Sequence, residues 1–261
     1  MGLNTYSSED KALLAVDCII FGFDKGDLKI LLIKRTFEPG LGEWSLIGGF
    51  LKKEENLDQA ASRVLHHLTG LRDIYMEQLY AFSKVDRDPA ERTISVAYYA
   101  LIDIATHDTS LIKQNSAQWF GLKDCPKLIF DHDRMVLHAI ARLRRKTSNN
   151  PIGFELLPEK FTMKQLQNLY ESILDKELDK RNFINKVNAL DILVKLEEKD
   201  MSVSRKGAYL FKFDEEKYKA KVEENNKTVL NIKSEKDTLK SEIWRFIVNE
   251  LDIDLKAYNS T

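Results

Sequence analysis

A glycine pair followed by an amphipathic helix, in residues 48–71 ("GGFLKKEENLDQAASRVLHHLTGL"), constrains the fold of this chain more than any other feature. Adjacent glycines supply permissive backbone where a strand turns into a loop. Asn56 is a suitable helix N-cap, and Gln59 three residues later completes a capping box. The apolar positions that follow recur at helical spacing and are Leu57, Ala61, Val64 and Leu68. We therefore expect a helix built for burial on one face.

The segments around this helix predict strands. Residues 13–36 form two runs rich in β-branched and leucine residues, and Asp24 to Asp27 between them suit a hairpin turn. Further strand-like runs cover 75–85, 93–104 and 117–122, and a basic amphipathic helix covers 133–146. We expect residues 1–148 to form one mixed α/β domain.

A polar stretch with proline and glycine, residues 147–153, indicates a domain boundary. In the second domain, predicted for residues 149–220, Thr162 and Gln165 fit a capping box. Asp179 is positioned to cap the next helix, with Phe183, Val187 and Leu190 facing inward. Two strands around a polar loop, which ends in Arg205 and Lys206, follow this helix.

Residues 221–261 form a C-terminal extension that begins with a charged, Asn-rich stretch. Ser234 is a suitable cap for one amphipathic helix in this extension. Its apolar face is Leu239, Ile243, Phe246, Ile247 and Leu251. A lone helix of this kind needs a surface on which to pack.

Bulk properties exclude several classes of protein. The chain has 261 residues, a net charge of −1 and two cysteines, which are too few for a disulfide framework. It contains no apolar run of about 18 residues and no secretory leader. We expect a cytoplasmic protein with no membrane partner.

The helix and the preceding glycines resemble the signature of the Nudix hydrolases, G-x5-E-x7-R-E-U-x-E-E-x-G-U, in which U is aliphatic. The matching residues are Gly49, Glu55, Arg63, Leu65, Gly70 and Leu71. The three metal-binding glutamates of that signature are replaced by Val64, His67 and Leu68. Magnesium prefers carboxylate ligands, so we expect no catalytic residue, no metal, no cofactor and no enzyme activity.

A Nudix fold without its metal keeps a concave face that can bind an effector. The candidate effector-binding residues are Asp17, Lys34, Arg35, Glu43, Trp44, Asp86 and Asp88. The loop "DRDPAER", which holds the last two, also supplies Arg87 and Arg92. Asp17 is equally compatible with a purely structural ion pair, and "DRDP" with an ordinary loop. Carboxylates in such a pocket favour neutral, hydroxyl-rich ligands.

The second domain, two helices with a short turn and a basic-tipped hairpin, resembles a winged helix-turn-helix. The candidate DNA-binding residues are Lys180, Arg181, Asn182, Asn185, Lys186, Arg205 and Lys206. Outward Lys, Arg and Asn also occur on any solvated helix, so the helix by itself leaves DNA binding open.

Both domains together resemble the Nudix-related transcriptional regulators, through "EWSLIGGF", "DRDPAERTISVAYYALI" and "DKRNFINKV". The resemblance implies an α+β protein, a Nudix-like sandwich followed by a winged helix, acting as a homodimer on a pseudo-palindromic operator. The sequence of these segments is most similar to the arabinose-responsive branch of the family. This similarity implies repression of carbohydrate catabolism and a sugar effector such as L-arabinose. Three alternatives stay open: an ADP-ribose-responsive regulator of NAD metabolism, a Nudix hydrolase of a nucleoside diphosphate derivative, and an adaptor that binds no DNA.

Overall fold

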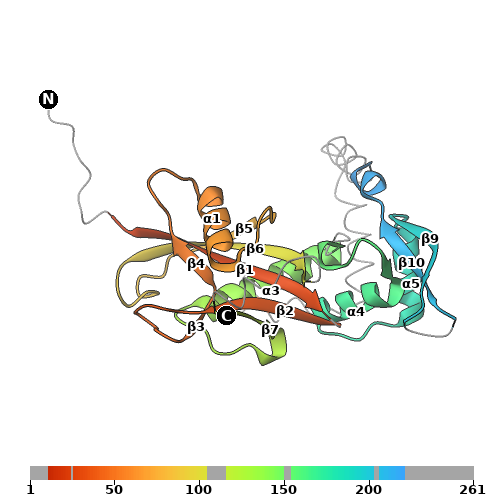
Figure 1. Cartoon of the computed structure of the whole chain (residues 1–261), viewed down its shortest axis with the longest axis horizontal. Coiled ribbons are helices and arrows are strands. Elements are labelled where there is room, and N and C mark those ends of the chain that lie inside the picture. The colour runs from red at the N-terminus through yellow and green to blue at the C-terminus, as the bar shows by residue number, and fades with distance from the viewer. Residues whose placement is uncertain (1–10, 25, 105–115, 150–153, 203–205, 221–261) are drawn as a thin grey trace, which may run out of the picture. The chain divides into compact units, whose positions relative to one another are not determined.

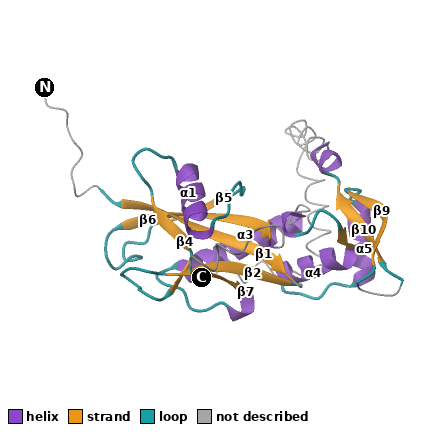
Figure 2. Ribbon diagram, in the orientation of Figure 1, coloured by secondary structure: helices purple, strands orange, loops and turns teal. Residues whose placement is uncertain are grey.

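The computed structural model describes residues 11–24, 26–104, 116–149, 154–202 and 206–220. The chain divides between Arg142 and Leu143 into two compact units, and each is considered by itself. Figure 1 labels the elements of both units, and Figure 2 shows that each mixes helices and strands. This mixture of helices and antiparallel and parallel strands is the expected α+β fold class.

The first unit is built around β1 (Leu13–Asp24), the central strand of a seven-stranded sheet. It pairs antiparallel with β2 (Asp27–Lys34) through the predicted hairpin, and parallel with β6 (Thr93–Asp103). Antiparallel β5 (Glu77–Phe82) extends the sheet beyond β6, and β7 (Ala117–Gly121) pairs with β2. These strands match the predicted runs.

Two short strands complete this sheet and were not expected. β3 (Trp44–Ser45) pairs with β2, and β4 (Ile47–Phe50) pairs antiparallel with β1. β4 contains the glycine pair, which we expected in a strand-to-loop turn. Its extended backbone places both glycines alongside β1, so they lie in the sheet itself.

The helices of this unit are α1 (Leu57–Thr69) and the part of α3 (His132–Asn149) up to Arg142, with a 3-10 turn, η3, at Leu122–Asp124. The Asn56–Gln59 capping box forms as predicted, and Gly70 ends α1 in the left-handed region. The buried face of α1, Ala60, Ala61, Val64 and Leu65, joins the core cluster of β1 and β6. Tertiary packing of that face holds the helix on the sheet.

The second unit contains η4 (Phe154–Leu156), β8 (Phe161–Thr162), α4 (Met163–Leu174) and α5 (Lys180–Ala189). It ends in the hairpin of β9 (Leu193–Asp200) and β10 (Ala208–Phe213), with β8 on the far side of β10. The capping box before α4 and the Asp179 cap of α5 both form as predicted.

One expectation for α5 is wrong. Leu190 was expected on the inner face but is 38% exposed, because the helix ends at Ala189 and Leu190 lies in its C-cap. Ile192, two residues later, is buried instead. Lys186, which was expected to point outward, is half-buried. In the ranges given above, no helix is long and apolar enough to cross a membrane.

Candidate functional site

The signature glycines are required by close side-chain contacts. Gly48 lies directly opposite Asp17 in the β1–β4 register, and a Cβ atom there would collide with Asp17 Oδ1. A Cβ atom at Gly49 would be 2.9 Å from Val64 Cγ2. Glycine at these two positions therefore lets a buried carboxylate and the helix α1 approach the same strand.

The positions that would carry metal-binding glutamates have other roles. Val64 is buried in the core, Leu68 lines a pocket and His67 is exposed. Within the described part of the chain, no group of three or more His, Cys, Asp or Glu side chains is placed to hold a metal ion.

The one glutamate that matches the signature, Glu55, is bound by the arginine that also matches it. Arg63 donates from Nε to Glu55 Oε2 at 2.7 Å and from Nη2 to Oε1 at 2.5 Å. This hydrogen bonding lowers the pKa of Glu55 to about 2. Arg63 Nη2 also donates to the carbonyl of Phe50 at 3.0 Å. The pair therefore joins α1 to the loop before it and to the end of β4.

A small pocket of about 140 Å³ opens beside the glycines. Four of the predicted effector-binding residues line it, namely Asp17, Lys34, Arg35 and Asp88. Arg87 and His132 contribute further polar side chains, and the apolar part of the lining includes Phe37, Phe50 and Leu68. The structure thus brings together residues from β1, the end of β2, the loop before β6 and the start of α3.

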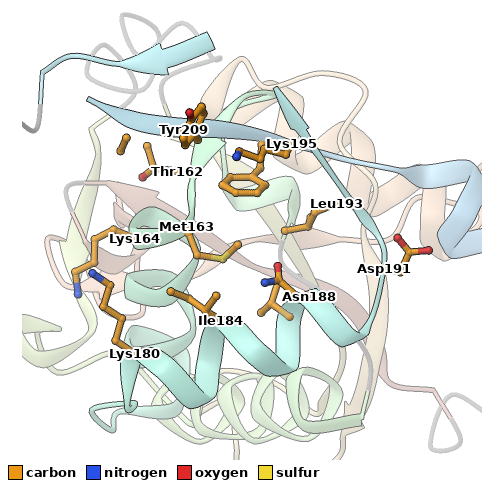
Figure 3. A pocket seen from close by; sticks show the side chains of 13 residues that line it. Thr162, Met163, Lys164, Lys180, Ile184, Asn188, Asp191, Leu193, Lys195 and Tyr209 are labelled. Atoms are coloured by element: carbon orange, nitrogen blue, oxygen red, sulfur yellow. The ribbon is translucent and has the colours of Figure 1, made fainter. Parts of the chain in front are cut away.

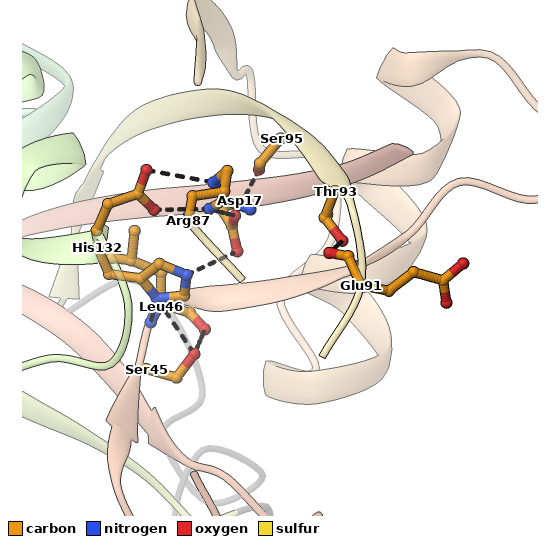
Figure 4. Close-up of polar contacts among 9 residues, drawn as sticks. Asp17, Ser45, Leu46, Arg87, Glu91, Thr93, Ser95 and His132 are labelled. Atoms are coloured by element: carbon orange, nitrogen blue, oxygen red, sulfur yellow. Dashed lines mark hydrogen bonds and ion pairs between the residues drawn. The ribbon is translucent and has the colours of Figure 1, made fainter. Parts of the chain in front are cut away.

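Asp17 is the centre of a buried polar network at this pocket (Figure 4). Its Oδ2 accepts a hydrogen bond from Ser95 Oγ at 2.5 Å and lies 3.8 Å from Arg87 Nη2. Its Oδ1 lies 3.7 Å from His132 Nε2. A carboxylate with 5% exposure is stable only with such partners.

Arg87 and His132 are themselves fixed by further contacts. Arg87 donates to both carboxylate oxygens of Asp131, at 2.8 and 3.2 Å. The backbone N–H of Leu46 donates to His132 Nδ1 at 3.2 Å, so the neutral ring carries its proton on Nε2, facing Asp17. Burial lowers the pKa of His132, and the charge of Asp17 partly opposes that effect.

Arg35 presents its charge to the pocket in a different way. Its guanidinium carbon lies 4.0 Å from the centre of the Phe37 ring and 5.4 Å from that of Phe130. Its Nε donates to the carbonyl of Phe37 at 3.2 Å. Burial lowers the pKa of Arg35, and Asp88 and Asp17 partly oppose that effect. Two aromatic rings therefore hold this cation at the mouth of the pocket.

Three predicted effector-binding residues do not line the pocket. Trp44 packs edge-on against Phe120, with ring centroids 4.7 Å apart. Glu43 is exposed on the turn before β3. Asp86 forms an exposed ion pair with Lys84 at 3.0 Å. Each lies near the lining in sequence, but its side chain leaves the backbone in another direction.

The charge balance of the pocket also differs from expectation. Two carboxylates, Asp17 and Asp88, share the lining with the cations Lys34, Arg35 and Arg87. Carboxylates therefore do not dominate, and the case for a neutral, hydroxyl-rich ligand is lost. Ser95, Asp131 and His132 were missed by sequence reasoning, since only the packing of distant segments brings them to Asp17.

In the second unit the candidate DNA-binding residues are mostly exposed. Lys180, Arg181, Asn182 and Asn185 lie exposed on the first two turns of α5, after the Asp179 cap. Lys206 is exposed in the turn before β10, and Arg205 lies outside the described residues. The exposed residues combine the positive end of a helix with side chains that contact phosphates and bases.

Comparison with known proteins covers both units. Residues 11–139 match the model of the NUDIX domain, and residues 153–213 match that of the NrtR DNA-binding winged helix domain. The chain is 35% identical over 207 residues to the ADPR responsive transcriptional repressor NtrR of Acinetobacter baylyi, which covers 77% of this chain and 82% of that protein. The crystal structure of Shewanella oneidensis NrtR complexed with a 27mer DNA superposes with a TM-score of 0.71 at 29% identity, covering 79% of this chain and 95% of that one.

A third relative matches a shorter part of the chain. The ADP-ribose pyrophosphatase of Methanocaldococcus jannaschii is 35% identical over 124 residues, which is 47% of this chain and 70% of that enzyme. The signature glutamates missing here, at positions 64, 67 and 68, separate this chain from the Nudix signature.

These matches correct the expected branch. The expectation of a sugar effector such as L-arabinose and of control of carbohydrate catabolism is wrong, because the regulator that matches both units is an ADPR responsive repressor. The expectation was based on segments such as "EWSLIGGF", which form β3, β4 and their turns. Similarity in these segments indicates the Nudix fold and does not identify the effector. The chain belongs to the NrtR-type family of transcriptional regulators, in which a Nudix domain precedes a DNA-binding winged helix domain.

Proposed function

We propose that this chain is an ADP-ribose-responsive transcriptional repressor of NAD metabolism, acting in the cytoplasm as a homodimer on a pseudo-palindromic operator. The observation that carries the proposal is the match to an ADPR responsive repressor over 77% of the chain, across both units. A match confined to the Nudix unit would support ligand binding alone. The match across both supports a ligand signal that acts on DNA binding.

The pocket of the first unit has the chemistry that ADP-ribose requires. A diphosphate needs cations, and Lys34 and Arg35 line the pocket beside the buried Arg87. Ribose hydroxyls need acceptors, which Asp17 and Asp88 provide. Phe37 and Phe50, 56% and 46% exposed, offer aromatic faces for the adenine base.

The second unit has the features of a DNA reader. Arg181 and Asn185 lie exposed on α5, where they are placed to contact bases, and Lys180 lies at its first position, where a phosphate contact is favourable. Lys206 extends the positive charge to the hairpin. We infer that α5 enters the major groove and that the hairpin contacts the backbone.

We further infer that ADP-ribose is bound without being hydrolysed. Val64 and Leu68 carry no oxygen ligands, and Glu55 is engaged by Arg63. A divalent ion that bridged the diphosphate would lack the carboxylates it prefers. Incubation of the full chain with ADP-ribose and Mg²⁺ or Mn²⁺ should yield no AMP or ribose 5-phosphate. Product formation that disappears in Glu55→Gln would contradict this inference.

The experiment that tests the main proposal is a fluorescence anisotropy titration of the full chain against its own upstream region. We expect binding with a sequence preference at physiological salt, which ADP-ribose changes and L-arabinose leaves unchanged. A thermal-shift measurement with both ligands checks effector binding without DNA. Equal affinity for the upstream region and for unrelated DNA would overturn the proposal.

A further inference from the structure

An open groove of about 720 Å³ crosses the second unit between α5 and the strands β9 and β10 (Figure 3). Its inner lining is apolar, and most of these side chains are only partly covered within the unit. The apolar lining residues are Met163, Ile184, Val187, Leu193, Ala208 and Phe211. Contacts with a DNA backbone are made by charged and polar groups, so these apolar residues are not needed for them. The groove therefore has the character of a protein docking surface.

Three lysines and one aspartate contribute charge to the rim of this groove. Lys164 and Lys180 lie together at one end, Lys195 lies by Tyr209 on the hairpin, and Asp191 lies at the end opposite the first two lysines (Figure 3). Lys164 has a 3.7 Å ion pair with Glu171, and Lys195 rests 3.7 Å above the Tyr209 ring. Within the described part of the unit, Lys180 makes no ion pair. An apolar floor with a positive rim fits an acidic amphipathic partner.

This chain carries such a partner in its own sequence. Residues 234–255 contain the apolar stripe that begins at Leu239 and ends at Leu251, with six acidic and three basic residues around it. The spacer between Ala220 and Ser234 has 13 residues and extends to about 45 Å. Because the described chain reaches Ala220 soon after β10, the spacer is long enough for the segment to reach the groove.

We propose that residues 234–255 dock as an amphipathic helix in the groove between α5 and the hairpin, and thereby restrict access of DNA to α5. Helix-in-groove recognition uses apolar anchors at i, i+4 and i+7, as Leu239, Ile243 and Phe246 provide. Asn188 lines the groove one turn from Asn185 on the same helix. A docked helix therefore covers a surface next to the exposed residues of α5.

The winged helix match ends at residue 213, so residues 221–261 lie outside both domain matches. Restriction of DNA access rests on the proposed function, whereas docking itself does not.

Limited trypsin digestion of the full chain tests docking without DNA. Lys240 lies inside the segment and away from the substituted positions, so cleavage after it, followed by mass spectrometry, reports the exposure of the segment. Phe246→Asp removes an anchor and should speed this cleavage at least tenfold. Val248→Asp, on the opposite side of the predicted helix, is the matched control and should leave the rate near that of the unaltered chain. Ile184→Glu alters the groove instead and should have the effect of Phe246→Asp.

Equal cleavage rates in the unaltered chain, Phe246→Asp and Ile184→Glu would overturn the proposal. Protection that is lost on tenfold dilution would also overturn it, because the occupant would then be the segment of a second copy. With operator DNA, Phe246→Asp should bind several-fold more tightly than Val248→Asp, and equal affinities would overturn the restriction of DNA access. If no variant binds DNA specifically, the proposed function fails while the digestion result still decides docking.

Discussion

The two cavities of this protein differ in size and in how their charged side chains are held. The pocket of the Nudix unit is about 140 Å³ and surrounds buried, ion-paired side chains, whereas the groove of the winged helix unit is about 720 Å³ and has its charged side chains at an exposed rim. Buried charges cost free energy unless they are paired, so a fold that keeps Asp17 and Arg87 in its interior indicates a site. The comparison favours the smaller pocket as the proposed effector site, because its charges are buried and positioned.

The helices beside these cavities show the same contrast. Both α1 and α5 begin with a polar cap, Asn56 and Asp179, and both bury one apolar face. In α1 the positions where a hydrolase would carry charge are filled by core packing at Val64 and by Leu68. In α5 the outward positions stay polar. The signature positions of α1 thus contribute to packing, whereas the outer face of α5 keeps exposed polar side chains.

Removal of Arg87 should have the largest effect and would test whether the polar pocket depends on its buried ion pairs. Arg87→Ala leaves Asp17 and Asp131 without their shared cation, and breaking a buried pair costs about 3–5 kcal/mol. We expect urea denaturation to show a loss of about 3 kcal/mol in the unfolding free energy of the Nudix unit. Arg92→Ala, a less buried neighbour, should cost under about 1 kcal/mol. A loss for Arg87→Ala no greater than that for Arg92→Ala would contradict the network.

The two adjacent glycines separate an effect on the polar pocket from an effect on the packing of α1. Gly48→Ala places a Cβ atom against Asp17, and Gly49→Ala places one against Val64. Both substitutions should destabilise by about 1–3 kcal/mol, as overpacked cores do. We expect only Gly48→Ala to abolish ADP-ribose binding in isothermal calorimetry, because only it moves the pocket carboxylate. Equal loss of binding in both variants would show that the pocket needs the strand as a whole.

On the winged helix side, removal of one exposed side chain should change function without changing stability. Arg181→Ala should weaken operator binding by about tenfold, or about 1.4 kcal/mol, in fluorescence anisotropy. Lys219→Ala, exposed beyond the hairpin, is the control and should have little effect. Both variants should keep their unfolding free energy within about 0.5 kcal/mol. If Arg181→Ala bound the operator as tightly as the unaltered chain, this face of α5 would not contact DNA.

Local features of the fold could be predicted from sequence, while the site could only partly be predicted. The capping boxes at Asn56 and Thr162 and the β1–β2 hairpin follow from short-range patterns, and they form as expected. β3 and β4 have two and four residues, too few for an alternating pattern. Asp17 was a candidate because a charge inside an apolar run is costly. Ser95 and His132 reach it only through the parallel β1–β6 pairing and the start of α3, which no local pattern indicates.

The smallest expected effect is a pH dependence confined to the polar pocket. His132 faces Asp17 and lies near Arg87, Asp131 and Arg35, and its burial lowers its pKa below the ordinary value of about 6.5. The unfolded chain then binds more protons than the folded one below that value, so stability is present above about pH 6.5 and is lost as the pH falls through the folded pKa.

Thermal midpoints of the Nudix unit measured from about pH 7.5 to about pH 5.5, which spans the ordinary histidine pKa, should therefore fall more steeply for the unaltered chain than for His132→Asn. The asparagine side chain would keep an acceptor for the Leu46 N–H without a group that titrates in this range. His138, whose pKa burial also lowers, is removed in a His138→Asn control, which should retain most of the slope because His138 is far less buried. The winged helix unit holds no histidine, since all five lie before residue 139, so its midpoint should stay flat over the same range. If the thermal midpoints of both units fell equally with pH, the titrating groups would lie outside the pocket. The proposed effect of His132 on stability would then be wrong.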